Sequence, residues 1–401
     1  MSTSTTTDAA AGRAVSPWMT FSLALACGLI VANLYYAQPL AGLISTALDL
    51  SPRATGLVVT LTQMGYGAGL LFIVPLSDLI ENRRLALIML AVCALALLAA
   101  ALSPNALLFL IAALFIGFGT VVVQVLIPYA AHLALEAERG RVVGNVMTGT
   151  LLGIMLARPI SSFIADLFSW KIVFFLSAGM MIVLTIVLGW VLPRRMPTSK
   201  LRYGKLMTSM VNLAATTPLL QRRALYQAAL GGAFSLFWTT TPLLLMGPKF
   251  HLSQGGIALF ALAGVAGAIA APIAGRVADR GWSRPATIFA MLLAAGAFPM
   301  THIAAEGSTF ALYLLVVAAI LLDFGVSANM AIGQRLIFSL GAEFRGRLNG
   351  LYVSAFFLGC AIGSAVGGWV YAQGGWTLTS WVGFAAPAGA LLYLGVRDGS
   401  V

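Results

Sequence analysis

The chain has 401 residues, of which 60% are hydrophobic and only 9% are charged, and its mean hydropathy is +0.96. An ordinary soluble domain carries about 25% charged residues, so this chain lacks the polar residues that would cover a soluble globule. The composition therefore excludes soluble classes and predicts a membrane protein. The net charge of +11 does not indicate nucleic-acid binding here, because basic residues of membrane proteins mark the cytoplasmic loops.

Apolar runs between charged or Gly/Pro breaks predict the path of the chain through the bilayer. One crossing takes about 20 apolar residues, and the sequence offers twelve such runs. They cover residues 18–45, 54–79, 85–102, 105–134, 142–168, 170–193, 222–247, 253–278, 285–304, 308–338, 346–372 and 375–396. We therefore predict an all-α membrane protein with twelve transmembrane helices.

One long connection divides these spans into two sets of six. The stretch from Arg194 to Arg223 holds seven of the 23 Lys and Arg residues, so it is typical of a basic cytoplasmic linker. The predicted order is an N-terminal tail, a six-helix bundle, the linker, a second six-helix bundle and a C-terminal tail, at residues 1–17, 18–193, 194–221, 222–396 and 397–401.

The positions of the basic residues predict the orientation. With the N-terminus inside, 19 of the 23 Lys and Arg residues fall in cytoplasmic segments, three fall outside, and Arg158 alone lies within a span. A bias of this size on short loops is a strong signal that the basic loops face the cytoplasm. Both termini are therefore expected on the cytoplasmic side.

The two sets of spans carry an internal repeat. Residues 139–170 align without gaps with residues 345–376 at an offset of 206, which pairs Gly153 with Gly359. Parallel repeats of this kind are typical of transporters, which bind their substrate near the midplane between the halves. The repeat predicts two pseudo-symmetric six-helix bundles.

The loops after spans two and eight resemble the signature G-x-L-A-D-R-x-G-R-K of the major facilitator superfamily. The loop after span eight reads GRVADRG from Gly275 to Gly281, and the loop after span two keeps its aspartate and basic pair but lacks both glycines. The resemblance covers nearly the whole chain and implies a conformational latch, in which the aspartate meets the N-terminus of span eleven, where the helix dipole favours a carboxylate. A solvated turn is the alternative. The candidate latch residues are Asp78, Arg83, Arg84, Asp279, Arg280 and Arg284.

Span eleven carries a second pattern, g-x8-G-x3-G-P-x2-G-G, with serine in place of the proline. In the superfamily this motif belongs to span five of antiporters, whereas span five of this chain departs from it. Small residues at this spacing let helices approach closely, so we predict a helix-packing motif. Its residues are Gly350, Gly359, Gly363, Ser364, Gly367 and Gly368.

Four short stretches resemble a narrower branch, the bacterial twelve-span drug:proton antiporters, which include sugar exporters. They are NLYYAQPL from Asn33, QMGY from Gln63, LDFG from Leu322 and GQR from Gly333. The branch implies a multi-pass protein of the bacterial inner membrane that exports small molecules in exchange for protons. This chain departs from the branch, however, because it lacks an acid in span one and an arginine in span four.

Two charged residues lie deep inside predicted spans. Arg158 is in span five, and Asp323 is the only acid deep in any span. Intramembrane charges are costly and usually functional. A carboxyl group away from water takes up a proton more readily, so Asp323 is our proton-coupling candidate. The alternative is that Asp323 is a permanently ionised partner of Arg158, whose own role is anion coordination, gating or structural pairing.

Spans one, four, seven and ten line the cavity in this superfamily. Their aromatic and amide side chains suit an amphipathic small molecule, although Trp and Tyr also serve as interfacial anchors. The candidate cavity residues are Asn33, Tyr36, Gln38, Gln124, Tyr129, Tyr226, Gln227, Trp238, Thr239, Thr240 and Asn329.

Motifs for chemistry are missing from the sequence. It has no P-loop, G-x-S-x-G, H-E-x-x-H or C-x-x-C, and its histidines show no metal-ligand spacing. We therefore expect no enzyme, no metal and no cofactor.

The expected activity is secondary transport of a drug-like molecule, sugar or other metabolite by alternating access, with proton-coupled efflux favoured. The alternatives are a uniporter or importer of a metabolite, and a non-transporting receptor on the same fold. The expected partners are the substrate, protons and the lipid bilayer, with no nucleic acid, and the protein is expected to be a monomer.

Overall fold

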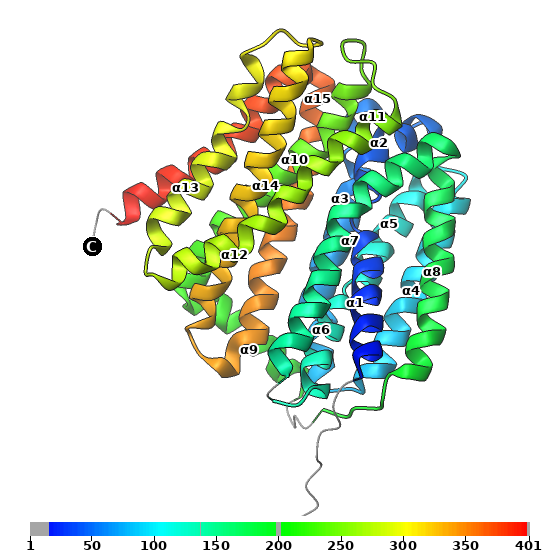
Figure 1. Cartoon of the computed structure of the whole chain (residues 1–401), viewed down its shortest axis with the longest axis vertical. Helices are drawn as coiled ribbons and strands as arrows, with labels where there is room; N and C mark the ends of the chain where they lie inside the picture. Colours follow the sequence, from blue (N-terminus) through cyan, green and yellow to red (C-terminus); the bar gives the residue numbers. More distant parts are fainter. Residues whose placement is uncertain (1–15, 137, 198–201, 399–401) are drawn as a thin grey trace, which may run out of the picture.

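The computed structural model describes residues 16–136, 138–197 and 202–398 (Figure 1). Over these residues all regular elements are helical. The N-terminal half contains α1 (Pro17–Ala32), α2 (Ala37–Ala47), η1 (Pro52–Ala54), α3 (Leu57–Phe72), η2 (Val74–Asp78), α4 (Asn82–Leu102), α5 (Ala106–Thr120), α6 (Val123–Leu133), α7 (Arg139–Leu167) and α8 (Trp170–Val191). Helix α9 (Tyr203–Thr216) follows. The C-terminal half contains α10 (Pro218–Met246), α11 (Gln254–Ala261), η3 (Leu262–Val265), α12 (Ala266–Asp279), α13 (Ser283–Gly296), η4 (Pro299–His302), α14 (Thr309–Phe338), η5 (Ala342–Phe344) and α15 (Arg345–Asp398).

The helices follow the predicted spans closely. Within the described residues, ten apolar helical stretches are long enough to cross a membrane. The predicted span 253–278 is divided among α11, η3 and α12, so no part of it alone reaches that length. The last two predicted spans form the single helix α15, whose backbone leaves helical geometry at Gly374 and at Gly375, where φ is +59°. A positive φ favours glycine, and this break divides α15 into two helical stretches that correspond to the predicted spans 346–372 and 375–396.

Helix ends follow the local sequence. Pro17 and Pro218 open α1 and α10, where the missing N–H of proline would have no partner in the helix. Asn105, Ser169 and Ser308 precede α5, α8 and α14, and each side chain accepts a hydrogen bond from a backbone N–H of the first turn.

The predicted linker contains a helix that the sequence reading did not anticipate. Helix α9 buries Leu206 and Met210 and exposes a mixture of polar and apolar side chains, among them Lys205 and Val211. The hydroxyl group of Tyr203 donates to the carbonyl of Phe72 at 3.0 Å, and Arg347 donates to Ser209. The linker helix therefore binds both halves of the protein.

Small residues bring helices of each half into close contact. A Cβ atom added to Gly153 of α7 would lie 2.1 Å from the carbonyl oxygen of Gly28 in α1. In the C-terminal half, a Cβ atom added to Gly363 of α15 would lie 2.0 Å from the carbonyl oxygen of Gly232 in α10. Such contacts are typical of membrane helices, which approach closely where side chains are small.

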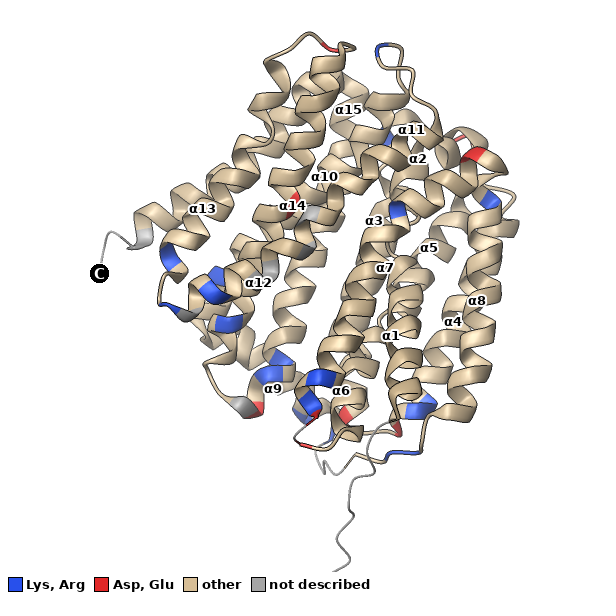
Figure 2. Cartoon of the chain, in the orientation of Figure 1, with Lys and Arg blue, Asp and Glu red and all other residues tan. Residues whose placement is uncertain are grey.

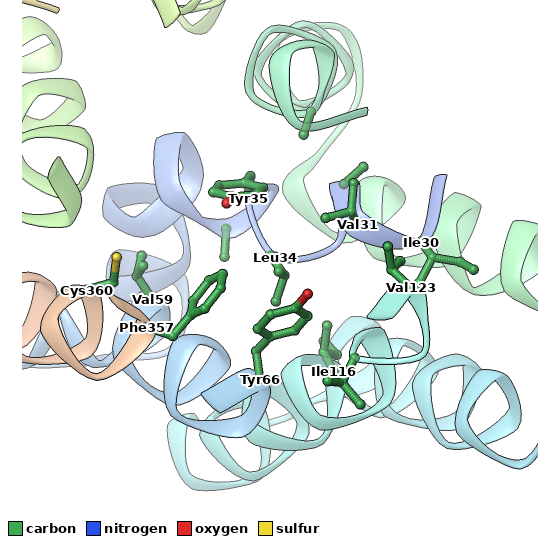
Figure 3. Packing of buried hydrophobic residues seen from close by; sticks show 14 of the residues in the cluster. Ile30, Val31, Leu34, Tyr35, Val59, Tyr66, Ile116, Val123, Phe357 and Cys360 are labelled. Atoms are coloured by element: carbon green, nitrogen blue, oxygen red, sulfur yellow. The ribbon is translucent and has the colours of Figure 1, made fainter. Parts of the chain in front are cut away.

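The halves contact each other along α3 and α15 and at one end of the molecule. Along α3 and α15, the rings of Tyr66 and Phe357 lie 4.4 Å apart between centroids (Figure 3). At the end that holds α2 and α11, an added Cβ on Gly42 would lie 2.9 Å from Cδ2 of Leu243. At the opposite end, α6 packs on α1, α4 and α7, whereas α12 packs on α13 and α14. Figure 1 shows α6 and α12 well apart at that end.

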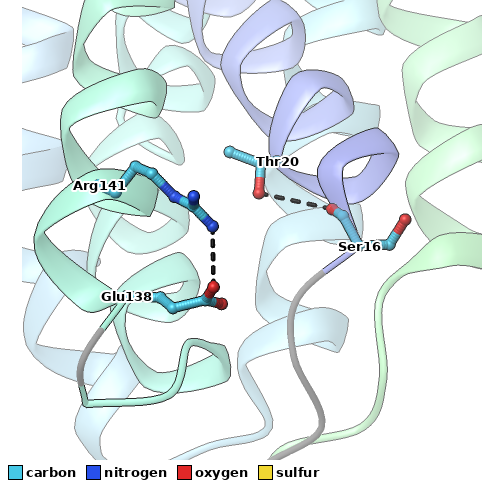
Figure 4. Close-up of polar contacts among 4 residues, drawn as sticks. All are labelled: Ser16, Thr20, Glu138 and Arg141. Carbon is cyan, nitrogen blue, oxygen red and sulfur yellow. Dashed lines mark hydrogen bonds and ion pairs between the residues drawn. The ribbon is translucent and has the colours of Figure 1, made fainter.

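The charged residues are distributed unevenly between the two ends. Lys and Arg gather around α6, α9 and the adjoining ends of α12 and α13, and few lie at the end with α2 and α11 (Figure 2). Among them, Arg141 pairs with Glu138 at 2.8 Å beside the start of α1, where Thr20 donates to the carbonyl of Ser16 (Figure 4). The basic end is thus the end at which α6 and α12 lie apart.

Candidate functional site

Arg158 is buried in the middle of the protein. It lies on α7 with 2% of its surface exposed, and its Nε donates a 2.7 Å hydrogen bond to Oε1 of Gln38. Gln38 sits in the first turn of α2, just after the irregular segment that separates α2 from α1. The break between these helices therefore brings the amide to the arginine.

Three aromatic rings surround the guanidinium group. Its carbon lies 4.3 Å from the ring centroid of Trp238, 5.0 Å from that of Tyr35 and 5.1 Å from that of Phe234. A cation over a ring face is attracted by the ring quadrupole, and the attraction grows when water is excluded. The rings replace part of the hydration that Arg158 has lost.

Asp323 belongs to the C-terminal half and lies close to one of the same aromatic rings. It lies on α14 with 4% exposure, and its Oδ1 accepts a 2.7 Å hydrogen bond from the indole nitrogen of Trp238. Trp238 on α10 therefore presents its ring face to Arg158 and its N–H to Asp323. We call Gln38, Arg158, Trp238 and Asp323 the central cluster.

The two charges of the central cluster are near each other without direct contact. Neither is in an ion pair within 4.0 Å among the described residues. A methyl group on Gly264 of η3 would lie 3.1 Å from Oδ2 of Asp323 and 3.3 Å from Nη1 of Arg158. A single methyl group would thus span the space between the charges. Their attraction is strong because the surroundings have a low dielectric constant.

Several buried polar atoms near the central cluster have no hydrogen-bond partner within the described part of the chain. They include Nη2 of Arg158, Nε2 of Gln38 and the hydroxyl groups of Ser162, Ser235 and Thr241. Ser162 is one turn from Arg158 on α7, and the other two flank Trp238 on α10. Buried polar groups are normally paired, so these groups leave hydrogen bonds for water or a bound molecule to complete.

A second polar group lies inside the C-terminal half. Asn329 donates to Oε1 of Gln227 at 2.6 Å, and the hydroxyl group of Tyr352 donates to the same oxygen at 3.3 Å. An added Cβ on Gly333 would lie 2.0 Å from the Tyr352 hydroxyl oxygen, so glycine at that position makes room for the tyrosine. The structure thus brings together two of the predicted cavity residues, Gln227 and Asn329.

Three other predicted cavity residues form hydrogen bonds within the N-terminal half. Asn33 accepts a 2.5 Å hydrogen bond from Ser177. Gln124 donates to the hydroxyl group of Tyr66 at 3.0 Å, and Tyr129 donates to the carbonyl of Pro193 at 2.5 Å. Their partners link α1 to α8, α6 to α3, and α6 to the segment after α8.

The remaining cavity candidates have varied surroundings. Tyr36 is partly exposed and lines a groove between α1 and α7 that has a volume of about 740 Å³. Tyr226 packs edge-on against Tyr393. Thr240 donates to a carbonyl of its own helix, and Thr239 is buried.

The predicted latch residues lie at the basic end. The positive charges of Arg347, at the start of α15, and Arg195 act on the Asp78 carboxylate, and Arg83 donates to the carbonyl of Gly189. Arg84, Arg280 and Arg284 are exposed, and the side chain of Asp279 lies outside the described part of the structure.

The predicted packing motif makes contacts on two sides of α15. Gly359 and Gly363 face α10, and an added Cβ on Gly367 would lie 3.1 Å from Leu236 there. The Ser364 hydroxyl lies 2.8 Å from that of Thr60, and an added Cβ on Gly368 would lie 2.5 Å from the nitrogen of Gly56, both in the other half. Gly350 has more room, with its nearest atom at 3.8 Å.

Sequence reasoning did not single out Tyr35, Phe234 or Gly264. Tyr35 lies inside the NLYYAQPL stretch, which gave a signal for the segment but not for this ring. Phe234 precedes Trp238 by four residues and so shares its helix face, which is the pattern that could have identified it. No sequence signal marked Gly264.

Comparison with known proteins agrees with this architecture. The model of the family described as Major Facilitator Superfamily matches residues 21–305 and 223–399. The Escherichia coli O157:H7 protein named "Uncharacterized transporter YgaY" is 36% identical over 362 residues, which cover 90% of this chain and 91% of that protein. A Streptomyces coelicolor protein named as a transporter is 32% identical over 376 residues, covering 93% and 85% of the two chains.

Solved structures share the fold at low sequence identity. The crystal structure of the nucleoside transporter NupG covers 94% of this chain and 99% of its own, with a TM-score of 0.77 and 14% identity. A D-xylose-proton symporter covers 94% and 96%, with a TM-score of 0.70 and 15% identity. The chain belongs to the major facilitator superfamily of membrane transporters.

Proposed function

We propose that the protein is a secondary active transporter that couples the movement of a small organic molecule to protons, with Asp323 as the proton-binding residue. One observation carries the proposal: buried, opposite charges from the two halves, Arg158 and Asp323, meet on either side of Trp238. Protonation of Asp323 would remove the attraction between the halves at this point. Proton binding and the rocking of the halves are thereby linked.

The proposed orientation follows the basic residues. If the basic end faces the cytoplasm, the halves pack together through α2 and α10 at the outer end, α6 and α12 lie apart at the cytoplasmic end (Figure 1), and both termini lie in the cytoplasm of a bacterium. Rocking of the halves about the central cluster would then open the outer side, as in alternating access.

Two directions of coupling are compatible with such a site. Export in exchange for protons is favoured by the resemblance to drug and sugar exporters. Import together with protons is the second candidate, and it is favoured by the unpaired donors of Arg158 and Gln38. An acceptor group that binds these donors leaves Asp323 less stabilised as a carboxylate, so such a substrate and the proton assist each other's binding.

Transport in vesicles tests the coupling. Proteoliposomes that contain the full chain and a trapped pH-sensitive dye are given a panel of drugs and sugars under pH gradients of either sign. Wild type is expected to move protons with at least one panel member, and the sign of the proton flux gives the direction. Asp323→Asn keeps the size of the side chain and is expected to make substrate flux independent of the gradient. Gradient-driven flux that is unchanged in Asp323→Asn would reject the proposal.

A further inference from the structure

Two buried nitrogen donors of the central cluster have no hydrogen-bond partner among the described residues, and both belong to the N-terminal half. Nε of Arg158 donates a hydrogen bond to Oε1 of Gln38. Nη2 of Arg158 and Nε2 of Gln38 are the two unpaired donors. Since each side chain holds the other in place, the hydrogen bond between them fixes the remaining donors next to each other. A buried donor without an acceptor is costly, and a charged donor more so, so the missing group is an acceptor.

A nearby groove indicates the chemistry of the rest of the ligand. The groove between α1 and α7 is lined by Leu25, Leu29, Leu152 and Leu156, and it extends to Tyr36 and Ala157. These last two residues directly adjoin Tyr35 and Arg158 in the sequence. An apolar groove thus ends beside the chain neighbours of the residues that hold the unpaired donors, and its cavity volume of about 740 Å³ is in the range of small-molecule sites.

We propose that the transported molecule is an amphipathic organic anion. Its carboxylate accepts hydrogen bonds from Nη2 of Arg158 and Nε2 of Gln38, and its apolar part lies in the groove between α1 and α7. Arginine is suited to carboxylates because its planar fork donates to both oxygens. This substrate class rests on the proposed function and extends it.

The charges of the central cluster determine how such an anion depends on protons. With Asp323 ionised, the cluster has no net charge, and with Asp323 protonated it carries the positive charge of Arg158. An anion therefore binds better to the protonated cluster, and the proton binds better when the anion is present. The substrate class accordingly selects import together with protons over exchange.

The test compares 4-phenylbutyrate with its primary amide, a pair that differs in charge at nearly constant shape. Binding to the purified full chain is measured by calorimetry at pH 6 and pH 8. Wild type is expected to bind the carboxylate about tenfold more tightly than the amide, because charge-assisted hydrogen bonds are roughly twice as strong as neutral ones. The preference is expected to be larger at pH 6 than at pH 8.

Two variants examine the site, each with a matched control. Arg158→Gln is expected to reduce the preference to within about twofold, while Arg139→Gln, at an exposed position of the same helix outside the groove, keeps it. Gly264→Ala retains both charges but places a methyl group between them, so it is expected to weaken carboxylate binding. Gly179→Ala is the control, because a Cβ there has no neighbour within 4 Å.

The outcomes separate the substrate class from the proton coupling. If the amide binds as tightly as the carboxylate, if neither binds to wild type, or if Arg158→Gln keeps the preference, the anion proposal is wrong. If the preference depends on Arg158 but gradient-driven flux is unaffected by Asp323→Asn, the substrate class stands and the proposed coupling falls.

Discussion

Gly363→Ala is expected to lower the free energy of unfolding by about 1–3 kcal/mol, the usual effect of forcing an extra methyl group into a packed contact. The new Cβ atom would lie 2.0 Å from the carbonyl oxygen of Gly232, which is backbone and cannot turn away. Helices α10 and α15 would have to separate along their contact. Denaturant titration of the purified protein in detergent measures the change.

The repeat supplies a second site for the same experiment. In the N-terminal half, Gly153→Ala would place a Cβ atom 2.1 Å from the carbonyl oxygen of Gly28, so a loss of similar size is expected. Gly179→Ala is the control, since the position has open space and alanine favours the helix. Equal stability of all three variants would show that the close contacts do not hold α10 against α15 or α1 against α7.

Removing one charge of the central cluster is expected to destabilise the protein more than removing both. Asp323→Leu leaves Arg158 buried without a compensating charge, and Arg158→Met does the same to Asp323. Such losses cost about 3–5 kcal/mol in buried pairs. The double variant leaves neither charge, so its cost is expected to be well below the sum of the single costs.

A double-mutant cycle on unfolding free energies measures this coupling. The cycle is informative because the two side chains make no direct ion pair, so that any coupling passes through Trp238 and the space beside Gly264. Trp238→Phe, which keeps a ring near Arg158 but removes the N–H donor, is a useful background for repeating it. Strictly additive costs would mean that Arg158 and Asp323 act independently.

The span pattern was predictable because hydrophobicity and helix ends are local properties. Each of these signals affects only the residues next to it. Examples are the apolar runs, the proline at the start of α10 (Pro218) and the helix break at Gly374 and Gly375. Helix α9 was not predicted because its short buried face, Leu206 and Met210, is surrounded by basic residues that indicated only a loop.

The central cluster was predictable only in part. Arg158 and Asp323 stood out because charge in a bilayer is costly. Their relation to Trp238 depends on contacts 80 and 85 residues apart along the chain, and no repeat or spacing encodes these contacts. Helix rotation likewise decides whether an amide faces a neighbouring helix, as Asn33 does, or a charged residue, as Gln38 does. The cavity roles of the other candidates stay predictions.

The rings around Arg158 also have a consequence for the ion gradients across the membrane. A carrier with a continuous file of water across the bilayer would let protons and other cations run down their gradients. Hydrophobic constrictions prevent such leaks by expelling water, and a fixed arginine repels cations. Tyr35, Phe234 and Trp238 enclose the guanidinium group where the two halves meet. We therefore expect the cluster also to act as an electrical insulator in the resting transporter.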